Sequence, residues 1–160
     1  MTRAVLVVLA FASLLIVPGI NAQTHPDFSG TWRFDPNRSD SATYPELSRP
    51  VTLVITQTPS EVRIETQTPR GTSTDTYQFG RANDVTSPGP AVARWSGDVM
   101  LADAVRDIRG QSVTVHRTFT LSKDGRELTI QSTVNVQHGY SMSRGKVYGA
   151  GKDVFVRVQP

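Results

Sequence analysis

The sequence predicts an all-β protein, folded as an antiparallel up-and-down barrel of about eight to ten strands. Helical periodicity is nearly absent after residue 22, and short runs rich in Thr and Val alternate between apolar and polar residues instead. Short turns separate most of these runs, so consecutive strands should pair antiparallel. A chain of hairpins leaves two exposed sheet edges, and closing the sheet removes both. A two-sheet β-sandwich is the alternative arrangement.

Residues 1–22 are expected to be a secretory signal peptide rather than part of this domain. Arg3 supplies a positive charge, residues 4–17 contain no charged side chain, and small residues precede a cleavage position after Ala22. The apolar run is too short to cross the roughly 30 Å of a membrane interior. We therefore expect a single domain over 23–160 that is exported to the periplasm or beyond the cell, with no membrane-spanning segment.

Four strands are expected in the first half of this domain. In the third, Val62 and Ile64 share one face while charged side chains occupy the other, which is typical of a half-buried strand. The fourth places Asp75, Tyr77 and Phe79 on one face. The expected strands are 28–34, 51–57, 61–67 and 72–79.

The second half contains three expected hairpins. The first joins 91–96 to 99–105, with a helical turn over 103–108 as an alternative for the end of that hairpin. The second joins 112–121 to 127–136 through Asp124-Gly125, and Asp-Gly is a strong signal for a tight hairpin turn. The third joins 143–148 to 153–158, with a turn at the glycine-rich residues 149–151.

The segment Asp27-Phe28-Ser29-Gly30-Thr31-Trp32 resembles the first-strand Gly-X-Trp signature of the lipocalin and wider calycin group. Its continuation to Ser39, and the hairpin of 118–130, resemble secreted bacterial lipocalin-like domains of unassigned function. The resemblance implies a lipocalin-like barrel. It also implies that a basic residue late in the barrel packs over the first-strand Trp, and Arg157 is the candidate to cover Trp32. A fold of this kind implies little about function, which depends on the site.

Composition excludes several classes of function. The chain has no cysteine, so it forms no disulfide and carries no lipid on an N-terminal cysteine. The net charge is +3, but the basic residues are scattered, and nucleic-acid binding requires a basic patch. His25, His116 and His138 share no metal-ligand spacing. His25 is expected to fray with the N-terminus, and His116 to lie on the polar face of its strand. We expect no metal, no cofactor and no nucleic-acid partner.

Polar residues on otherwise apolar strand faces point to a binding site inside the barrel. Arg117 shares its face with Phe119, and a buried arginine needs a partner, which we expect to be Asp75. An eight-stranded barrel is either packed solid or holds one small ligand. The predicted function is therefore binding of a small, largely apolar molecule. The predicted ligand-binding residues are Trp32, Tyr77, Trp95, Arg117 and Phe119.

Other interpretations of the same residues remain open. The aromatic side chains fill an ordinary core in one of them, and Arg117 then lies at the barrel mouth with its charged end in water. A non-enzymatic envelope protein that binds another protein would expose an apolar patch, for which the loop 35–50 offers Tyr44 and Leu47. A small calycin-like enzyme would carry a histidine or an acid with a shifted pKa inside the cavity. Because no Gly-X-Ser-X-Gly motif occurs, we do not expect an enzyme.

Overall fold

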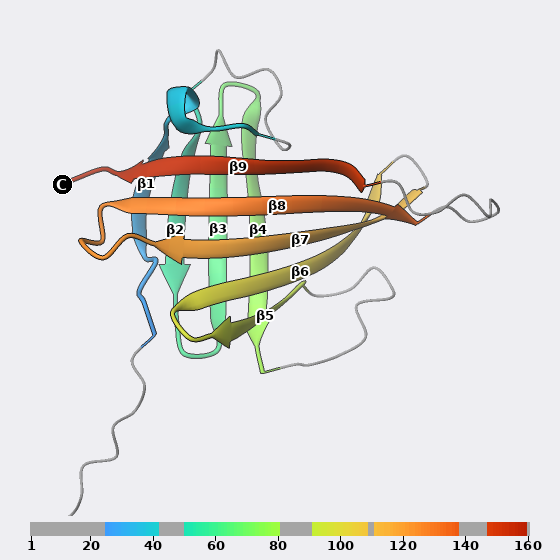
Figure 1. Ribbon diagram of the computed structural model, residues 1–160, viewed down its shortest axis with the longest axis horizontal. Helices are drawn as coiled ribbons and strands as arrows, with labels where there is room; N and C mark the ends of the chain where they lie inside the picture. The colour runs from blue at the N-terminus through green and yellow to red at the C-terminus, as the bar shows by residue number, and fades with distance from the viewer. Residues whose placement is uncertain (1–24, 42–49, 81–90, 109–110, 138–146, 160) are drawn as a thin grey trace, which may run out of the picture.

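A computed structural model of the chain shows a closed barrel and so confirms the predicted fold class (Figure 1). It describes residues 25–41, 50–80, 91–108, 111–137 and 147–159. Within them β1 pairs with β9, which closes the sheet, so the sandwich alternative is wrong. The strands are β1 (Gly30–Phe34), β2 (Thr52–Gln57), β3 (Glu61–Thr68), β4 (Gly71–Phe79), β5 (Ala91–Ser96), β6 (Val99–Ile108), β7 (Gln111–Leu121), β8 (Glu127–Gln137) and β9 (Val147–Arg157); one 3₁₀ helix, η1, spans Pro36–Arg38.

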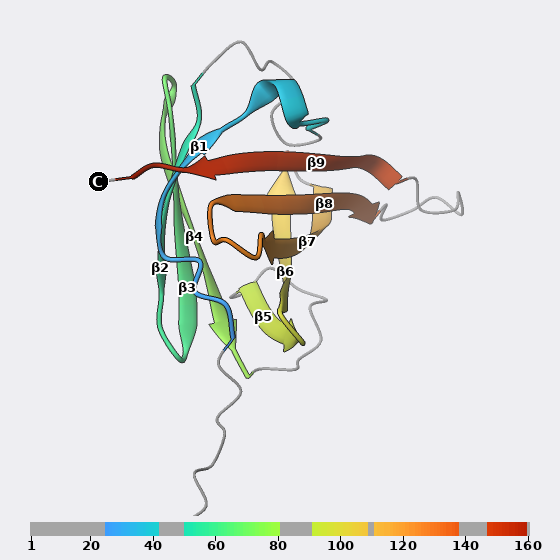
Figure 2. The same ribbon diagram turned by 60° about the vertical axis from the view of Figure 1, so that its left-hand side comes forward.

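The barrel has two facing walls. Figure 2 shows β1–β4 as one wall and β5–β9 as the other, and in Figure 1 the strands of the two walls cross steeply. All neighbouring strands pair antiparallel except β4 and β5, which pair parallel over Tyr77–Phe79 and Ala91–Ala93. No tight hairpin joins these two strands, since residues 81–90 separate them in the sequence, and a two-residue hairpin would require an antiparallel pair.

Two predicted details are wrong. β6 continues to Ile108 as a strand, so the helical turn over 103–108 is not formed. β9 runs from Val147 to Arg157 without a break, although we expected a turn at 149–151. β8 supplies the reason, because Ser132 pairs with Gly151 and Val134 with Gly149, and this ladder holds the glycine-rich stretch extended. The first part of the expected strand 143–148 lies outside the described residues.

Alternation along the strands packs the interior with large side chains at one end of the barrel, which we call the closed end. Phe28 lies just before β1 and is fully buried there, and Trp32 Nε1 donates a hydrogen bond to its carbonyl oxygen over 2.9 Å. The Phe119 ring lies between those of Phe28 and Tyr77, with centroid separations of 6.2 Å to each. The largest fully buried side chains are Trp32, Tyr77, Phe28, Phe119, Phe155, Leu53, Met100, Leu128 and Val62.

Arg157 binds the closed end together and confirms the contact that the lipocalin resemblance implied. Its guanidinium lies 4.1 Å from the centre of the Trp32 ring. It also donates hydrogen bonds to the carbonyl oxygens of Ser29 at 2.6 Å and Gly125 at 2.8 Å. Gly30 makes room for it, because a Cβ at that position would lie 2.7 Å from Arg157 Nη1, and its φ of +134° also favours glycine.

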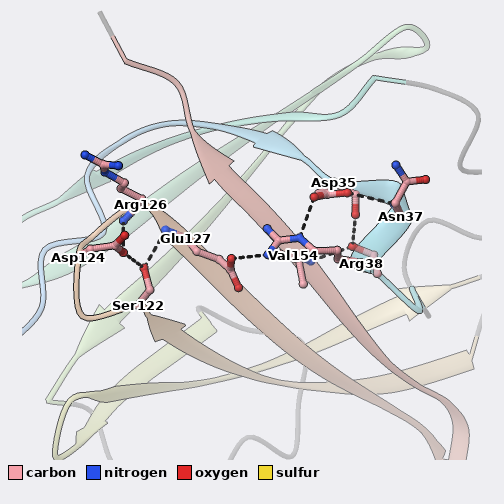
Figure 3. A network of polar contacts seen from close by, with 9 residues as sticks. Asp35, Asn37, Arg38, Ser122, Asp124, Arg126, Glu127 and Val154 are labelled. Carbon is pink, nitrogen blue, oxygen red and sulfur yellow. Dashed lines mark hydrogen bonds and ion pairs between the residues drawn. The ribbon is translucent and has the colours of Figure 1, made fainter.

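A strap of residues 35–41 runs alongside β9 and is hydrogen-bonded to it (Figure 3). Arg38 forms ion pairs with Asp35 at 2.8 Å and with Glu127 at 2.7 Å. Further along, Ser39 Oγ accepts a hydrogen bond from the Val154 amide, and Asp40 pairs with Lys152 as an isolated β-bridge. The strap is thereby fixed beside the middle of β9, where it reaches the candidate site.

Candidate functional site

The described residues of the barrel interior line a small cavity between its two walls. The volume open to the centre of a water molecule is about 20 Å³, enough for about one water molecule. Leu53 on β2 and Thr66 on β3 pair with each other on one wall, while Arg117 on β7 pairs with Ser132 on β8 on the other. The complete lining consists of Leu53, Ile64, Thr66, Arg117, Phe119, Ile130, Ser132, Asp153 and Phe155.

Arg117 forms a partly buried polar cluster with two residues of β4. Its Nη1 donates to Asp75 Oδ2 over 2.9 Å and to the Tyr77 hydroxyl over 2.5 Å. The Arg117 and Asp75 side chains are each 17% exposed, so the guanidinium is held inside the barrel and not in bulk water. The expected partnership of Arg117 with Asp75 is confirmed. It exists because alternation points both side chains inward from strands on opposite walls.

Asp153 and Ser132 supply two further polar groups to the cavity, and both residues are only 3% exposed. Within the described residues, neither Asp153 Oδ1 nor Ser132 Oγ has a hydrogen-bond partner. Burial raises the pKa of Asp153, and a side-chain hydrogen bond with Ser41 and the charge of Arg117 offset part of that rise. The strap thus contacts the site through Ser41.

Sequence reasoning did not select Asp153. The available signal was the alternation of Asp153, Phe155 and Arg157, which places the three side chains on one face of a strand. The interpretation of 149–151 as a turn concealed this, because it made Asp153 the first residue of a short strand. Pairing of Asp153 with Ile130 on β8 places the carboxyl group well inside the sheet.

The five predicted ligand-binding residues divide into two groups. Arg117 and Phe119 line the cavity, and Tyr77 contacts it indirectly through its hydroxyl on Arg117. Trp32 is fully buried at the closed end beneath Arg157. Trp95 is partly buried, and its ring lies nearly parallel to three others, with centroid separations of 4.4 Å to His25, 5.5 Å to Phe79 and 5.8 Å to Phe28.

Neither His25 nor His116 lines the cavity. His116 lies on the outer surface, where its Nδ1 is 2.7 Å from Asp103 Oδ1, and Arg94 Nη1 is 2.6 Å from the other oxygen of that carboxylate. Burial alone would raise the pKa of Asp103, but hydrogen bonds from Arg94 and His116 bring it below its usual value. His25 stacks on Trp95, so the expectation that it frays is wrong. His138 lies outside the described residues.

In the described ranges, no group of three or more His, Cys, Asp or Glu side chains could hold a metal ion. Nor does any helix there have the length and apolar character needed to cross a membrane. Of the large hydrophobic side chains described, only Val158 is exposed, at 44%. Tyr44 and Leu47, where an apolar patch was considered, lie outside the described residues.

Comparison with known proteins gives similarity of backbone only. No protein-family model matches the chain, and no curated protein matches its sequence. Fatty-acid-binding protein 1 of Echinococcus granulosus has a TM-score of 0.43 and 13% identity, over 82% of this chain and 98% of that one. A mutant of the fluorescent protein UnaG has a TM-score of 0.46 and 14% identity, over 83% of this chain and 97% of its own. At these scores, neither neighbour indicates what this chain binds.

Proposed function

We propose that this protein is an exported barrel that binds a small, largely apolar molecule at the cavity between β2–β3 and β7–β9. The observation that carries the proposal is a set of buried polar and charged groups gathered around one cavity with otherwise apolar walls. Arg117, Ser132 and Asp153 supply the polar contacts, and Phe119 and Phe155 are among the apolar ones. A site of this composition, mostly apolar with a few convergent polar groups, is typical of small-molecule pockets.

A purely structural role explains these polar groups less well. Removing charges from water is costly, and a buried ion pair is often no more stabilising than apolar residues of the same size. Asp153 adds a second buried acid, and burial makes its ionisation unfavourable. Since neighbouring positions on the same strand faces hold Ile130 and Phe155, an apolar interior was accessible to this fold.

The size of the cavity limits how a ligand enters. About 20 Å³ admits one or two heavy atoms, so the rest of a larger ligand must displace lining side chains. Thr66 and Arg117 are the lining residues best suited to move, because neither is fully buried and the arginine side chain is long. Binding therefore requires widening of the cavity next to Arg117.

Export is part of the proposal and is supported by the signal-like residues 1–22. Mass spectrometry of the protein secreted from its host tests it, and we expect a mature N-terminus near Gln23. An intact Met1 in the purified protein would contradict export by this route.

Native mass spectrometry of the purified protein tests ligand binding. We expect an excess mass that is lost on denaturation, or uptake of at least one compound from a panel of small amphiphiles. Ser132→Val should reduce uptake because it fills the cavity, whereas the matched Gln131→Val, on the outer face of the same strand, should not. Equal uptake by both variants would show that the ligand does not bind in this cavity.

Catalysis is a second candidate, favoured by one observation: Asp153 is an acid in the cavity with a raised pKa, as an enzyme would require. The expected alternative, His116, lies on the outer surface. Chemical change of a bound compound over time, abolished in Asp153→Asn, would establish catalysis. Recovery of every bound compound unchanged would show that the protein binds these compounds without catalysing a reaction.

A further inference from the structure

Two polar atoms in the cavity lack a partner in the described part of the chain. Asp153 Oδ1 and Ser132 Oγ belong to residues that are 3% exposed, and both residues line the cavity from neighbouring strands. Unsatisfied polar atoms at this depth are unfavourable, and each is expected to meet a hydrogen-bonding group. A carboxylate oxygen can only accept a hydrogen bond, so the group that meets Asp153 must be a donor.

The Arg117 guanidinium is already paired with an acid of the barrel. Its Nη1 already donates to Asp75 Oδ2 and to the Tyr77 hydroxyl. A ligand carboxylate would share the charge of the guanidinium with Asp75 and would also lie close to Asp153. Arg117 and Asp153 line the cavity, and Asp75 pairs with Arg117. With both carboxyl groups ionised, a positive charge on the ligand balances the site and a negative charge does not.

The dimensions of the cavity favour the same kind of group. Its volume of about 20 Å³ corresponds to about one water molecule. An ammonium group places a single heavy atom there, whereas a carboxylate needs room for a carbon and two oxygens. The cavity is partly open. Apart from Thr66, Arg117, Ser132 and Asp153, its lining residues are apolar: Leu53, Ile64, Phe119, Ile130 and Phe155.

We propose that the ligand is a small apolar molecule carrying a protonated primary amine, whose ammonium group donates hydrogen bonds to Asp153 Oδ1 and Ser132 Oγ. The inference rests on the proposed function, because it names the head group of the ligand in the same cavity. An ammonium group beside Asp153 also offsets the cost of burying that carboxylate in its ionised form. The hydrocarbon part of the ligand then contacts the apolar walls.

Titration of the ¹⁵N-labelled protein with n-butylammonium chloride, followed by two-dimensional NMR, tests this assignment. Sodium butyrate and 1-butanol serve as probes of matched length at the same ionic strength. We expect saturable shifts of the amides of 130–132 and 152–154, with butylammonium binding about tenfold more tightly than either comparator, as for a charge-assisted hydrogen bond. Asp153→Asn and Ser132→Ala should each weaken amine binding by about fivefold or more, while Gln131→Ala, facing outward, should not.

The outcomes separate this inference from the function on which it rests. Tighter binding of butyrate at the same amides would overturn the amine assignment and leave a ligand-binding barrel. Equal binding of butanol would overturn the requirement for positive charge. If neither Asp153→Asn nor Ser132→Ala weakens amine binding, the proposed hydrogen bonds from the ammonium group to these two residues are wrong. If Asp153→Asn does not fold, Ser132→Ala and the comparators decide the matter. Absence of binding by all three probes, with no ligand seen by mass spectrometry, would contradict the proposed function itself.

Discussion

Replacement of Arg157 by alanine tests how the closed end is held together. The guanidinium makes three contacts that alanine cannot: a position 4.1 Å above Trp32, and hydrogen bonds to the carbonyl oxygens of Ser29 and Gly125. These contacts connect β9 to the segment before β1 and to the β7–β8 turn. Loss of the side chain therefore removes the contacts that join β9, the segment before β1 and the β7–β8 turn.

The size of the effect follows from these contacts. A hydrogen bond from a charged donor contributes about 1.5–3 kcal/mol, and a cation–π contact about 0.5–2 kcal/mol. Arg157 is partly exposed, so water can reach the freed carbonyl oxygens of Ser29 and Gly125, and the lower ends of these ranges apply. We expect Arg157→Ala to lower the free energy of unfolding by about 2–4 kcal/mol.

Urea unfolding followed by far-ultraviolet circular dichroism measures the change. The matched control is Arg33→Ala, an exposed arginine on β1, for which we expect a change within about 0.5 kcal/mol. Arg157→Lys should recover less than half of the loss, because an ammonium group cannot stack on Trp32 and reach both carbonyl oxygens together. If Arg157→Ala is no more destabilising than Arg33→Ala, the account of the closed end is wrong.

Three further predictions concern single side chains. Gly30→Ala should destabilise by about 1–3 kcal/mol because φ is +134° and the new Cβ would meet Arg157; additivity with Arg157→Ala in urea unfolding would refute the steric part. Asp103→Asn should be less stable than the parent protein at pH 7. The pKa of Asp103 in the folded state lies below its usual value of 3.8, so the ionised carboxylate stabilises the fold at pH values above 3.8. That difference should disappear as the pH falls through the folded-state pKa, and a gap in thermal unfolding independent of pH would contradict it. Asp153→Asn should behave in the opposite way, because the pKa of Asp153 is raised in the folded state. The contribution of Asp153 to the stability of the parent protein is complete below pH 3.8 and is lost as the pH rises through the folded-state pKa. The variant should thus be more stable than the parent at pH 8, with the difference closing toward pH 4, and a less stable variant at pH 8 would exclude an unfavourable buried carboxylate.

Strand positions and strand faces could be predicted from the sequence, because both depend on residues close together in the chain. Alternation in 61–67 places Val62 and Ile64 in the core. The hairpin expected at Asp124-Gly125 forms with a φ of +69° at Gly125, but its turn is centred one residue earlier, because the Gly125 amide donates to the Ser122 carbonyl oxygen. The same local logic places Arg117 on an inward face, and its charge requires a partner of opposite sign. That is why Asp75, the acid on an inward face of another strand, could be identified as the partner.

The remaining features depend on how distant strands meet. Closure of β1 onto β9 and the parallel pairing of β4 with β5 are set by the whole sheet, and 149–151 stays extended because β8 lies beside it. The meeting of Asp153, Ser132 and Arg117 around one cavity, with Trp32 and Trp95 elsewhere, follows from the register of β7, β8 and β9. Periodicity specifies on which side of its own strand a side chain lies. Only the tertiary structure specifies what lies opposite, because contacts across a barrel join residues that no short segment of sequence contains.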